Sequence, residues 1–256
     1  MKTNDKKKVV AIIPARMAST RLPGKPLAKI LGLELIEHVR RRVQLCEALD
    51  SVFVATCDDE IKNALAKYGG KVIMTAKNHE RCTDRIAEAA IKIEADIVIN
   101  VQGDEPMVTP DMITGVLKPL LDDSNCQVVN LISLIDNKED FINPNVIKTV
   151  CDVDGNVLYF SREPIPSEKK FKGSVKAFRQ LGVIAFRKDF LITFSKLPQM
   201  PLEKFESIDM LRLLEHGYRI KTAITTQKSY GVDTLEDLRL AENLLKADKL
   251  LNKYMA

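Results

Sequence analysis

The first half of the chain alternates short segments that are apolar at every position with longer segments of helical periodicity. Residues 9–14, VVAIIP, form the first apolar segment, and such continuity is typical of a strand buried on both faces. Residues 35–49 follow with hydrophobic residues at helical spacing. The pattern repeats, with strands expected at 51–56, 71–75 and 95–106 and helices at 58–70, 82–94 and 110–123. This alternation predicts an α/β fold with a parallel sheet and helices on both faces.

The second half of the chain is more mixed. Its β-branched segments predict strands at 126–135, 146–162, 179–187 and 220–226, and DVDGN at 152–156 has the composition of a hairpin turn. Helices are expected at 188–196, 203–217 and 234–253. We therefore expect a single domain over residues 1–256, with a mixed, lid-like second half.

Composition argues against several classes of partner. The net charge of +4 is mild, Trp is absent and aromatic residues make up 5% of the chain, so a nucleic-acid-binding surface is not expected. No segment is long and apolar enough to predict a membrane span or a secretory signal. The five cysteines form no CxxC pair, which is typical of reduced thiols in a cytosolic protein. We expect a cytoplasmic protein with neither a membrane nor a nucleic-acid partner.

The loop that follows the first apolar segment concentrates positive charge. Arg16, Arg21 and Lys25 lie within ten residues, and Gly24 allows the backbone to turn sharply. In an open parallel sheet, ligands bind beyond the carboxyl ends of the strands, where this loop is expected to lie. Exposed amides and fixed cations at that place suit a polyphosphate, although the loop is neither a Walker A loop nor a GxGxxG motif. The alternative is a surface loop with three solvated cations.

Two acidic segments could bind the metal cation that would neutralise such a phosphate. Asp104 and Glu105 follow the strand expected at 95–106, and Asp233 lies between a strand and a helix. Carboxylate oxygens at strand ends suit Mg²⁺, which shares its ligands with phosphates. Asp233 has an equally good alternative role as a helix N-cap, because Asp-Thr-x-Glu is a capping pattern.

Five ordered sequence blocks resemble the 3-deoxy-manno-octulosonate cytidylyltransferase (CMP-Kdo synthetase) family. They are IIPARMASTRLPGKPL, INVQGDEP, FINPNVIKTV, LYFSREPIP and GVDTLEDL, and the likeness extends from about residue 9 to 245. The resemblance implies a Rossmann-like nucleotidyltransferase fold, with a mixed, mainly parallel sheet, helices on both faces and a small lid-like insertion. It also implies a Mg²⁺ cofactor and a homodimer. It further implies transfer of CMP from CTP to the anomeric hydroxyl of a 2-keto-3-deoxy sugar acid, for lipopolysaccharide or capsule synthesis. The nucleotide would bind to the half at about 9–125, and sugar binding and dimerisation would fall to about 126–230.

The resemblance also assigns roles to individual residues. Arg16, Lys25, Asp104 and Asp233 would be catalytic, and the two aspartates would hold the metal. The remaining assignments are Pro14, Ala15, Arg16, Arg21, Lys25, Thr83, Arg85 and Gln102 for the nucleotide, and Gln102, Arg162, Gln180 and Asp209 for the sugar acid. A guanidinium such as that of Arg162 pairs well with a carboxylate.

Three short segments depart from the family pattern. Arg81–Cys82 replace a Ser-Gly pair, Gln180 replaces a His, and Asp209–Met210 replace a Glu-Gln pair. The last two departures fall in the family's sugar pocket, so Kdo is expected first and a modified or related ulosonic acid is the alternative.

Two further functions remain open at this point. One is a nucleotidyltransferase that uses UTP or GTP on a sugar 1-phosphate, although the PARMASTRLPGKP loop argues against it. The other, from a different class, is a non-catalytic nucleotide-binding module. Intact Asp104, Asp233 and Lys25 argue against the second.

Overall fold

The sheet anticipated from the apolar segments lies at the centre of the computed structural model, which describes residues 6–19, 21–167, 169 and 176–255. Its strands run in the order β11-β7-β10-β6-β1-β4-β5. The pairings are parallel except at β10, which is antiparallel to both of its neighbours, so the sheet is mixed and mainly parallel, as predicted. The strands are β1 (Val9–Ala15), β4 (Ser51–Thr56), β5 (Val72–Met74), β6 (Ile97–Val101), β7 (Val128–Leu134), β10 (Phe178–Arg187) and β11 (Lys221–Thr225).

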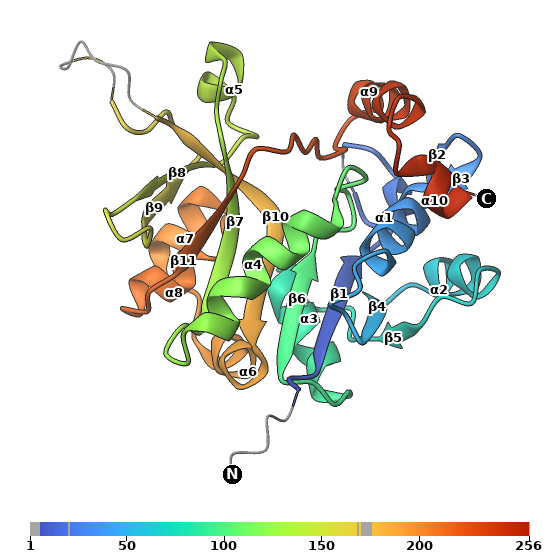
Figure 1. Cartoon of the computed structure of the whole chain (residues 1–256), viewed down its shortest axis with the longest axis horizontal. Coiled ribbons are helices and arrows are strands. Elements are labelled where there is room, and N and C mark those ends of the chain that lie inside the picture. Colours follow the sequence, from blue (N-terminus) through green and yellow to red (C-terminus); the bar gives the residue numbers. More distant parts are fainter. Residues whose placement is uncertain (1–5, 20, 168, 170–175, 256) are drawn as a thin grey trace.

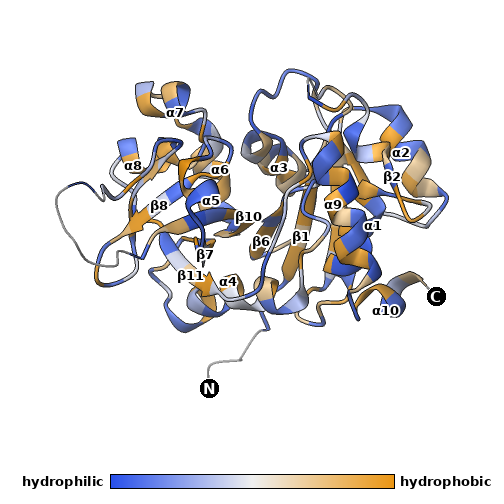
Figure 2. Cartoon of the chain, turned by 90° about the horizontal axis from the view of Figure 1, so that it is seen from above, coloured by the Kyte–Doolittle hydropathy of each residue, from blue (hydrophilic) through white to orange (hydrophobic). Residues whose placement is uncertain are grey.

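Helices cover both faces of this sheet (Figures 1 and 2). One core cluster packs α1 (Leu35–Gln44), α2 (Asp59–Ala66) and α4 (Pro110–Asp122) against one face. A second cluster packs α3 (Cys82–Ile91), α6 (Lys188–Lys196) and α8 (Leu211–Glu215) against the other. Every residue of β1 is buried, which is why that strand is apolar throughout.

The second half adds a hairpin and a short helix beside the sheet. Strands β8 (Lys148–Cys151) and β9 (Val157–Ser161) pair with each other around the expected turn at 152–156. Strand β8 also pairs with the beginning of β10. Helix α5 (Lys138–Ile142) follows β7 and projects beyond the sheet edge (Figure 1).

Two of the expected helices are interrupted. The helix predicted at 203–217 is two helices, α7 (Pro201–Glu206) and α8, because Ser207 ends α7 in the left-handed region at a φ of 55°. The helix predicted at 234–253 is also two, α9 (Leu235–Lys246) and α10 (Leu251–Met255). Apolar periodicity carries through both breaks, so it did not reveal them.

Helix α9 returns the chain to the loop after β1. It packs on the small pair β2 (Lys29–Ile30) and β3 (Leu33–Glu34), in a third cluster that also holds Val232. A short 3-10 helix, η1 (Lys25–Leu27), precedes β2, and Gly24 before it has a φ of 69°. This packing brings the segment around residue 232 next to the segment around residue 25.

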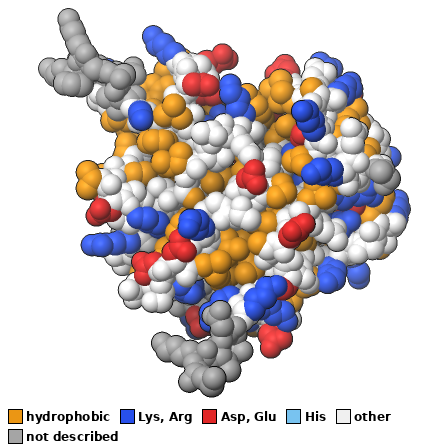
Figure 3. All heavy atoms as spheres, viewed as in Figure 1, with side chains coloured by type: hydrophobic (Ala, Val, Ile, Leu, Met, Phe, Trp, Pro, Cys, Tyr) orange, Lys and Arg blue, Asp and Glu red, His pale blue; other side chains and the backbone are white. Residues whose placement is uncertain are grey.

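The surface in Figure 3 mixes charge of both signs. Basic and acidic side chains lie interspersed with hydrophobic ones over this face. Among the described residues no helix has the length and hydrophobicity needed to cross a membrane.

Candidate active site

A cavity of about 1420 Å³ opens at the sheet edge where β1 and β6 end. Its wall includes residues 14–16 at the end of β1, residues 25–26 in the loop that follows, residues 102–105 after β6, and residues 224–231 at and after the end of β11. These segments meet because β1 and β6 are parallel neighbours, so their carboxyl ends lie together. A volume above the usual range for one small ligand leaves room for a nucleotide and a second substrate.

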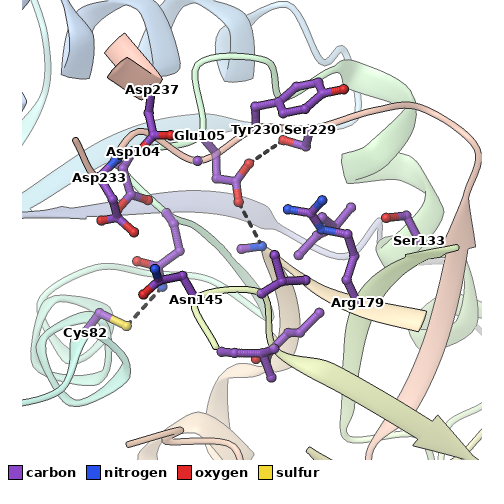
Figure 4. A pocket seen from close by; sticks show the side chains of 18 of the residues that line it. Cys82, Asp104, Glu105, Ser133, Asn145, Arg179, Ser229, Tyr230, Asp233 and Asp237 are labelled. Carbon is purple, nitrogen blue, oxygen red and sulfur yellow. Dashed lines mark hydrogen bonds between the residues drawn. The ribbon is translucent and has the colours of Figure 1, made fainter. Parts of the chain in front are cut away.

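Lys25 joins the two predicted acidic segments. Its Nζ lies 2.7 Å from Asp104 Oδ2 and 3.0 Å from Asp233 Oδ1. Burial disfavours the ammonium, but the two carboxylates outweigh it, so the pKa of Lys25 is raised above its ordinary value. The backbone supports this convergence, since Val232 N donates to Asp104 O at 2.9 Å. Asp104 and Asp233 therefore face one point, as Figure 4 shows.

The N-cap role of Asp233 is excluded by the local geometry. Thr234 caps α9, and its hydroxyl accepts from Asp237 N while Asp237 in turn accepts from the Thr234 backbone amide. This capping box leaves the carboxylate of Asp233 free to face the cavity, where Oδ2 pairs with Arg21 NH2 at 2.9 Å.

The loop after β1 presents its cations to the same cavity. Pro14, Ala15 and Arg16 line the wall, and the loop is anchored where Met17 N donates to Asp58 Oδ2 at 2.7 Å. Arg21 reaches across the cavity mouth, and its NH1 donates to Asn145 Oδ1 at 2.9 Å. The loop thus lies along the cavity wall, with Lys25 mostly buried and Arg16 and Arg21 exposed to solvent.

Glu105 ties three of these segments together. Its carboxylate accepts from the Ser229 hydroxyl and from Gly182 N at 3.4 Å (Figure 4). Burial raises the pKa of Glu105 above its ordinary value. Gly103, two residues before it, has no room for a side chain, because a Cβ there would lie 2.7 Å from Pro14 O. The turn after β6 is therefore packed tightly against the end of β1.

The beginning of α3 forms another part of the wall. Arg85 lines the cavity and donates to Thr75 Oγ1 at 2.5 Å. Thr83, predicted as a nucleotide contact, is not among the lining residues, because its side chain is fully buried in the first turn of α3. Its hydroxyl donates instead to Asp209 Oδ2 at 2.6 Å.

Three of the four residues assigned to the sugar acid line the cavity together. Gln102 comes from the turn after β6, Gln180 from β10, and Asp209 from the break between α7 and α8. Residues from three distant segments thus contribute to one cavity wall, and we call the part that these three residues form the sugar end. The interruption of the expected helix is what allows Asp209 to reach it.

The structure gives Arg162, which was predicted to bind the sugar acid, a different environment. It is not among the lining residues, and its guanidinium is bound to backbone carbonyls, with Nε donating to Glu206 O at 2.6 Å and NH2 to Ser207 O at 3.3 Å. These are carbonyls at the end of α7 that lack helical partners. Arg162 therefore holds the end of α7 and lies outside the cavity lining.

Arg179 and Asn145 also line the cavity, and neither was predicted as a site residue from the sequence. Arg179 NH1 pairs with Asp140 Oδ2 at 3.2 Å, while its buried Nε has no hydrogen-bond partner among the described residues. Asn145 lies within the block FINPNVIKTV, so a signal for it was present in the sequence. Arg179 precedes Gln180 directly, but nothing in the pattern of that strand distinguished it.

The donors at Asp104 and Asp233 fit a hard divalent cation. Both offer carboxylate oxygens, the ligand type that Mg²⁺ prefers. In the described part of the chain no group of three or more His, Cys, Asp or Glu side chains is placed to hold a metal. An ion bound to these two aspartates would therefore complete its coordination with phosphate oxygens and water.

Comparison with known proteins agrees with this geometry. The sequence model of the family described as "Cytidylyltransferase" matches residues 10–224. A 3-deoxy-manno-octulosonate cytidylyltransferase of Geobacter metallireducens is 43% identical over 241 residues, which cover 90% of this chain and 95% of that protein. The chain belongs to the 3-deoxy-manno-octulosonate cytidylyltransferase family.

Solved structures place this cytidylyltransferase family member among similar folds. A CMP:2-keto-3-deoxy-manno-octonic acid synthetase complexed with CTP has a TM-score of 0.88 at 38% identity, covering 94% of this chain and 99% of the other. A 4-diphosphocytidyl-2C-methyl-D-erythritol synthase from Anaerococcus prevotii has a TM-score of 0.62 at 16% identity, covering 94% of this chain and all of the other. The second likeness concerns the fold alone, and both agree with the nucleotidyltransferase fold expected from the sequence.

Proposed function

We propose that the protein transfers CMP from CTP to the anomeric hydroxyl of 3-deoxy-manno-octulosonate and releases pyrophosphate. The observation that carries the proposal is the convergence of Lys25, Asp104 and Asp233 at one point beneath the loop after β1. Relatives that align over nearly the whole chain are cytidylyltransferases for this sugar acid, which supports the same conclusion. The product would supply lipopolysaccharide or capsule synthesis.

The basic and the acidic residues of the cavity have different roles in the proposed reaction. Arg16, Arg21 and Lys25 neutralise the β- and γ-phosphates and the departing pyrophosphate, so they stabilise charge as it moves to the leaving group. The sugar hydroxyl attacks the α-phosphorus in line, and no nucleophilic side chain is needed. Asp104 and Asp233 would hold Mg²⁺, which when bound polarises the phosphate and lowers the pKa of the attacking hydroxyl.

The sugar end of the cavity supports a second candidate within the same reaction. Gln180 and Asp209 line it, and both replace residues of the family pattern. A modified or related ulosonic acid is therefore the alternative acceptor for CMP.

A homodimer and a cytoplasmic location belong to the same proposal. The second half exposes hydrophobic side chains, among them Val153, Leu158 on β9 and Phe205 on α7. Apolar surface of this kind favours association of subunits. All five cysteines are free thiols, which suits the reducing cytoplasm where CTP is made. Light scattering after gel filtration should give twice the chain mass of 28.8 kDa, and a monomer would contradict the dimer.

A pyrophosphate-release assay tests the proposed reaction. CTP, UTP and GTP are each offered with Kdo, with other ulosonic acids and with a sugar 1-phosphate, in the presence and absence of Mg²⁺. We expect turnover with CTP and a ulosonic acid, dependent on Mg²⁺. Turnover with UTP and a sugar 1-phosphate would favour the other class of nucleotidyltransferase. Binding of CTP without pyrophosphate release from any ulosonic acid would favour a non-catalytic module.

A further inference from the structure

Two glutamine side chains face the end of the cavity that also contains Asp209. Gln102 and Gln180 both line it, from the turn after β6 and from β10. A glutamine amide can offer a ligand either its carbonyl oxygen, which accepts, or its amino group, which donates. Neighbouring residues that form a hydrogen bond with one of these two groups fix the orientation of the amide, and so decide which group faces the ligand.

The orientation of Gln180 is fixed by a fully buried asparagine behind it. Asn130 Nδ2 lies 2.8 Å from Leu131 O and 3.3 Å from Leu181 O, and carbonyls only accept, so this atom must be the amino group. Asn130 Oδ1 is therefore the atom that faces Gln180, at 2.7 Å from its Nε2. This bond uses one of the two N–H groups of the Gln180 amide and fixes the orientation of the side chain, so the carbonyl oxygen keeps its lone pairs for a ligand.

The orientation of Gln102 is fixed in the same way through Cys82. Asp209 Oδ2 lies 3.5 Å from Cys82 Sγ, and a carboxylate only accepts, so the thiol proton points to Asp209. The sulfur then accepts from Gln102 Nε2 at 2.9 Å (Figure 4). Burial raises the pKa of Cys82 well above its ordinary value, so the thiol keeps the proton that this arrangement requires.

Packing removes the freedom of Gln102 to rearrange. Gln102 N donates to Gly182 O at 2.8 Å. A Cβ on Gly182 would lie 2.6 Å from Gln102 Cγ, so the Gln102 stem lies directly on the backbone of β10. In the described part of the chain neither glutamine oxygen accepts a hydrogen bond, and neither is a buried, unpartnered atom.

We infer that Asn130 and Cys82 are positioning residues that make the sugar end of the cavity a pair of fixed hydrogen-bond acceptors, Gln180 Oε1 and Gln102 Oε1, which select substrates by hydroxyl groups that donate. This inference rests on the proposed function and deepens it. The hydroxylated chain of a ulosonic acid supplies such donors. A carboxylate has none, so the acid group binds to cations elsewhere in the cavity.

Substrate analogues test the direction of these hydrogen bonds. Deoxy sugar acids lack one hydroxyl, whereas deoxyfluoro sugar acids keep an atom of similar size that cannot donate. For at least one position we expect both analogues to lose about three- to tenfold in kcat/KM, the size of one hydrogen bond. That penalty should disappear in Gln180→Leu or in Gln102→Leu. Deoxyfluoro analogues that are turned over like the parent sugar acid at every position would overturn the inference.

Variants of Cys82 test the positioning role. Cys82→Ala removes both hydrogen bonds of the thiol, and we expect it to raise the KM for the sugar acid about three- to tenfold while the KM for CTP changes less than twofold. Cys82→Ser keeps a donor for Asp209 and an acceptor for Gln102, so it should recover most of the loss. Cys57→Ala, a cysteine outside the cavity, is the matched control and should behave like the unaltered protein.

Asn130→Leu tests the second positioning residue. It frees the Gln180 amide to rotate, so discrimination against the deoxyfluoro analogues should shrink, and circular dichroism checks that the variant folds. If Asn130→Leu does not fold, the Cys82 variants alone test the inference. Equal KM values for the sugar acid in Cys82→Ala, Cys82→Ser and the unaltered protein would contradict the inference. Absence of turnover of any ulosonic acid by the unaltered protein would instead defeat the proposed function.

Discussion

Lys25 lies where three segments that are distant in the sequence meet. The ammonium is mostly buried, with 14% of the side chain exposed, between carboxylates from residues 104 and 233. The sequence could place each of these residues at a strand end, because strand ends are read from apolar runs and turn residues. It could not choose between a metal ligand and an N-cap for Asp233, since that depends on whether Thr234 caps the helix.

Lys25→Met should abolish most of the activity and leave the fold intact. The variant keeps the length of the side chain and removes the charge that stabilises the departing phosphates, a change that typically costs ~10²–10³ in rate. Pyrophosphate release measures the loss, and thermal unfolding checks the fold. Lys29→Met, an exposed neighbour on β2, should match the unaltered protein. A Lys25→Met enzyme with near-normal turnover would remove Lys25 from the site.

Arg162 lies outside the cavity lining, although the sequence predicted that it binds the sugar acid. The sequence block that contains it places a cation near the end of β9, which is where the structure has it. What the sequence could not show is that α7 ends beside it and presents carbonyls without partners. Those carbonyls compete for the guanidinium with any ligand. The roles of Asn130 and Cys82 were missed for the same reason, because both depend on contacts between distant segments.

Glu105 links the turn after β6 to β10 and to the segment that carries Asp233. Glu105→Ala should destabilise the protein by about 1–3 kcal/mol, because Ser229 and the Gly182 amide lose a buried acceptor. Glu105→Gln keeps an acceptor oxygen and should lose less. Urea denaturation gives the two values, with Glu60→Ala, exposed on α2, as the control. Equal stability of the alanine and glutamine variants would show that the hydrogen bonds contribute nothing.

Helix α3 is joined to the segment after β5 by Glu88. This carboxylate accepts from Lys92 at 2.7 Å, from Ala76 N at 2.9 Å and contacts His79 Nε2 at 2.5 Å. Burial opposes the charge, but these partners outweigh it and lower the pKa of Glu88 from 4.5 to about 2. Between pH 4.5 and about pH 2, the folded protein therefore binds fewer protons than the unfolded chain.

The stability that Glu88 contributes should be present above pH 4.5 and lost as the pH falls to about 2. The unaltered protein should thus be more stable than Glu88→Gln at pH 7, and the gap should close on acidification. Urea denaturation at several pH values measures it, with Glu60→Gln as the control. A gap that stays constant from pH 7 to pH 2.5 would contradict the assigned contacts.

The overall fold was predictable for reasons that differ between the two halves. In the first half each strand is buried on both faces and each helix has an apolar stripe, so local pattern and tertiary structure agree. The breaks at residues 207 and 247 were not predictable, because apolar periodicity continues through them. The break at residue 207 matters most, since it brings Asp209 to the cavity.

In the proposed reaction Asp104 and Asp233 act as one unit, and a cycle of three variants tests this most directly. Asp104→Asn, Asp233→Asn and the double variant are compared by kcat/KM for CTP in the pyrophosphate-release assay. Each single variant should lose ~10²–10³, and the double variant should lose little more than the worse single, because residues that serve one function are not additive. Losses that multiply in the double variant, or a single variant with unchanged kcat/KM, would contradict the account.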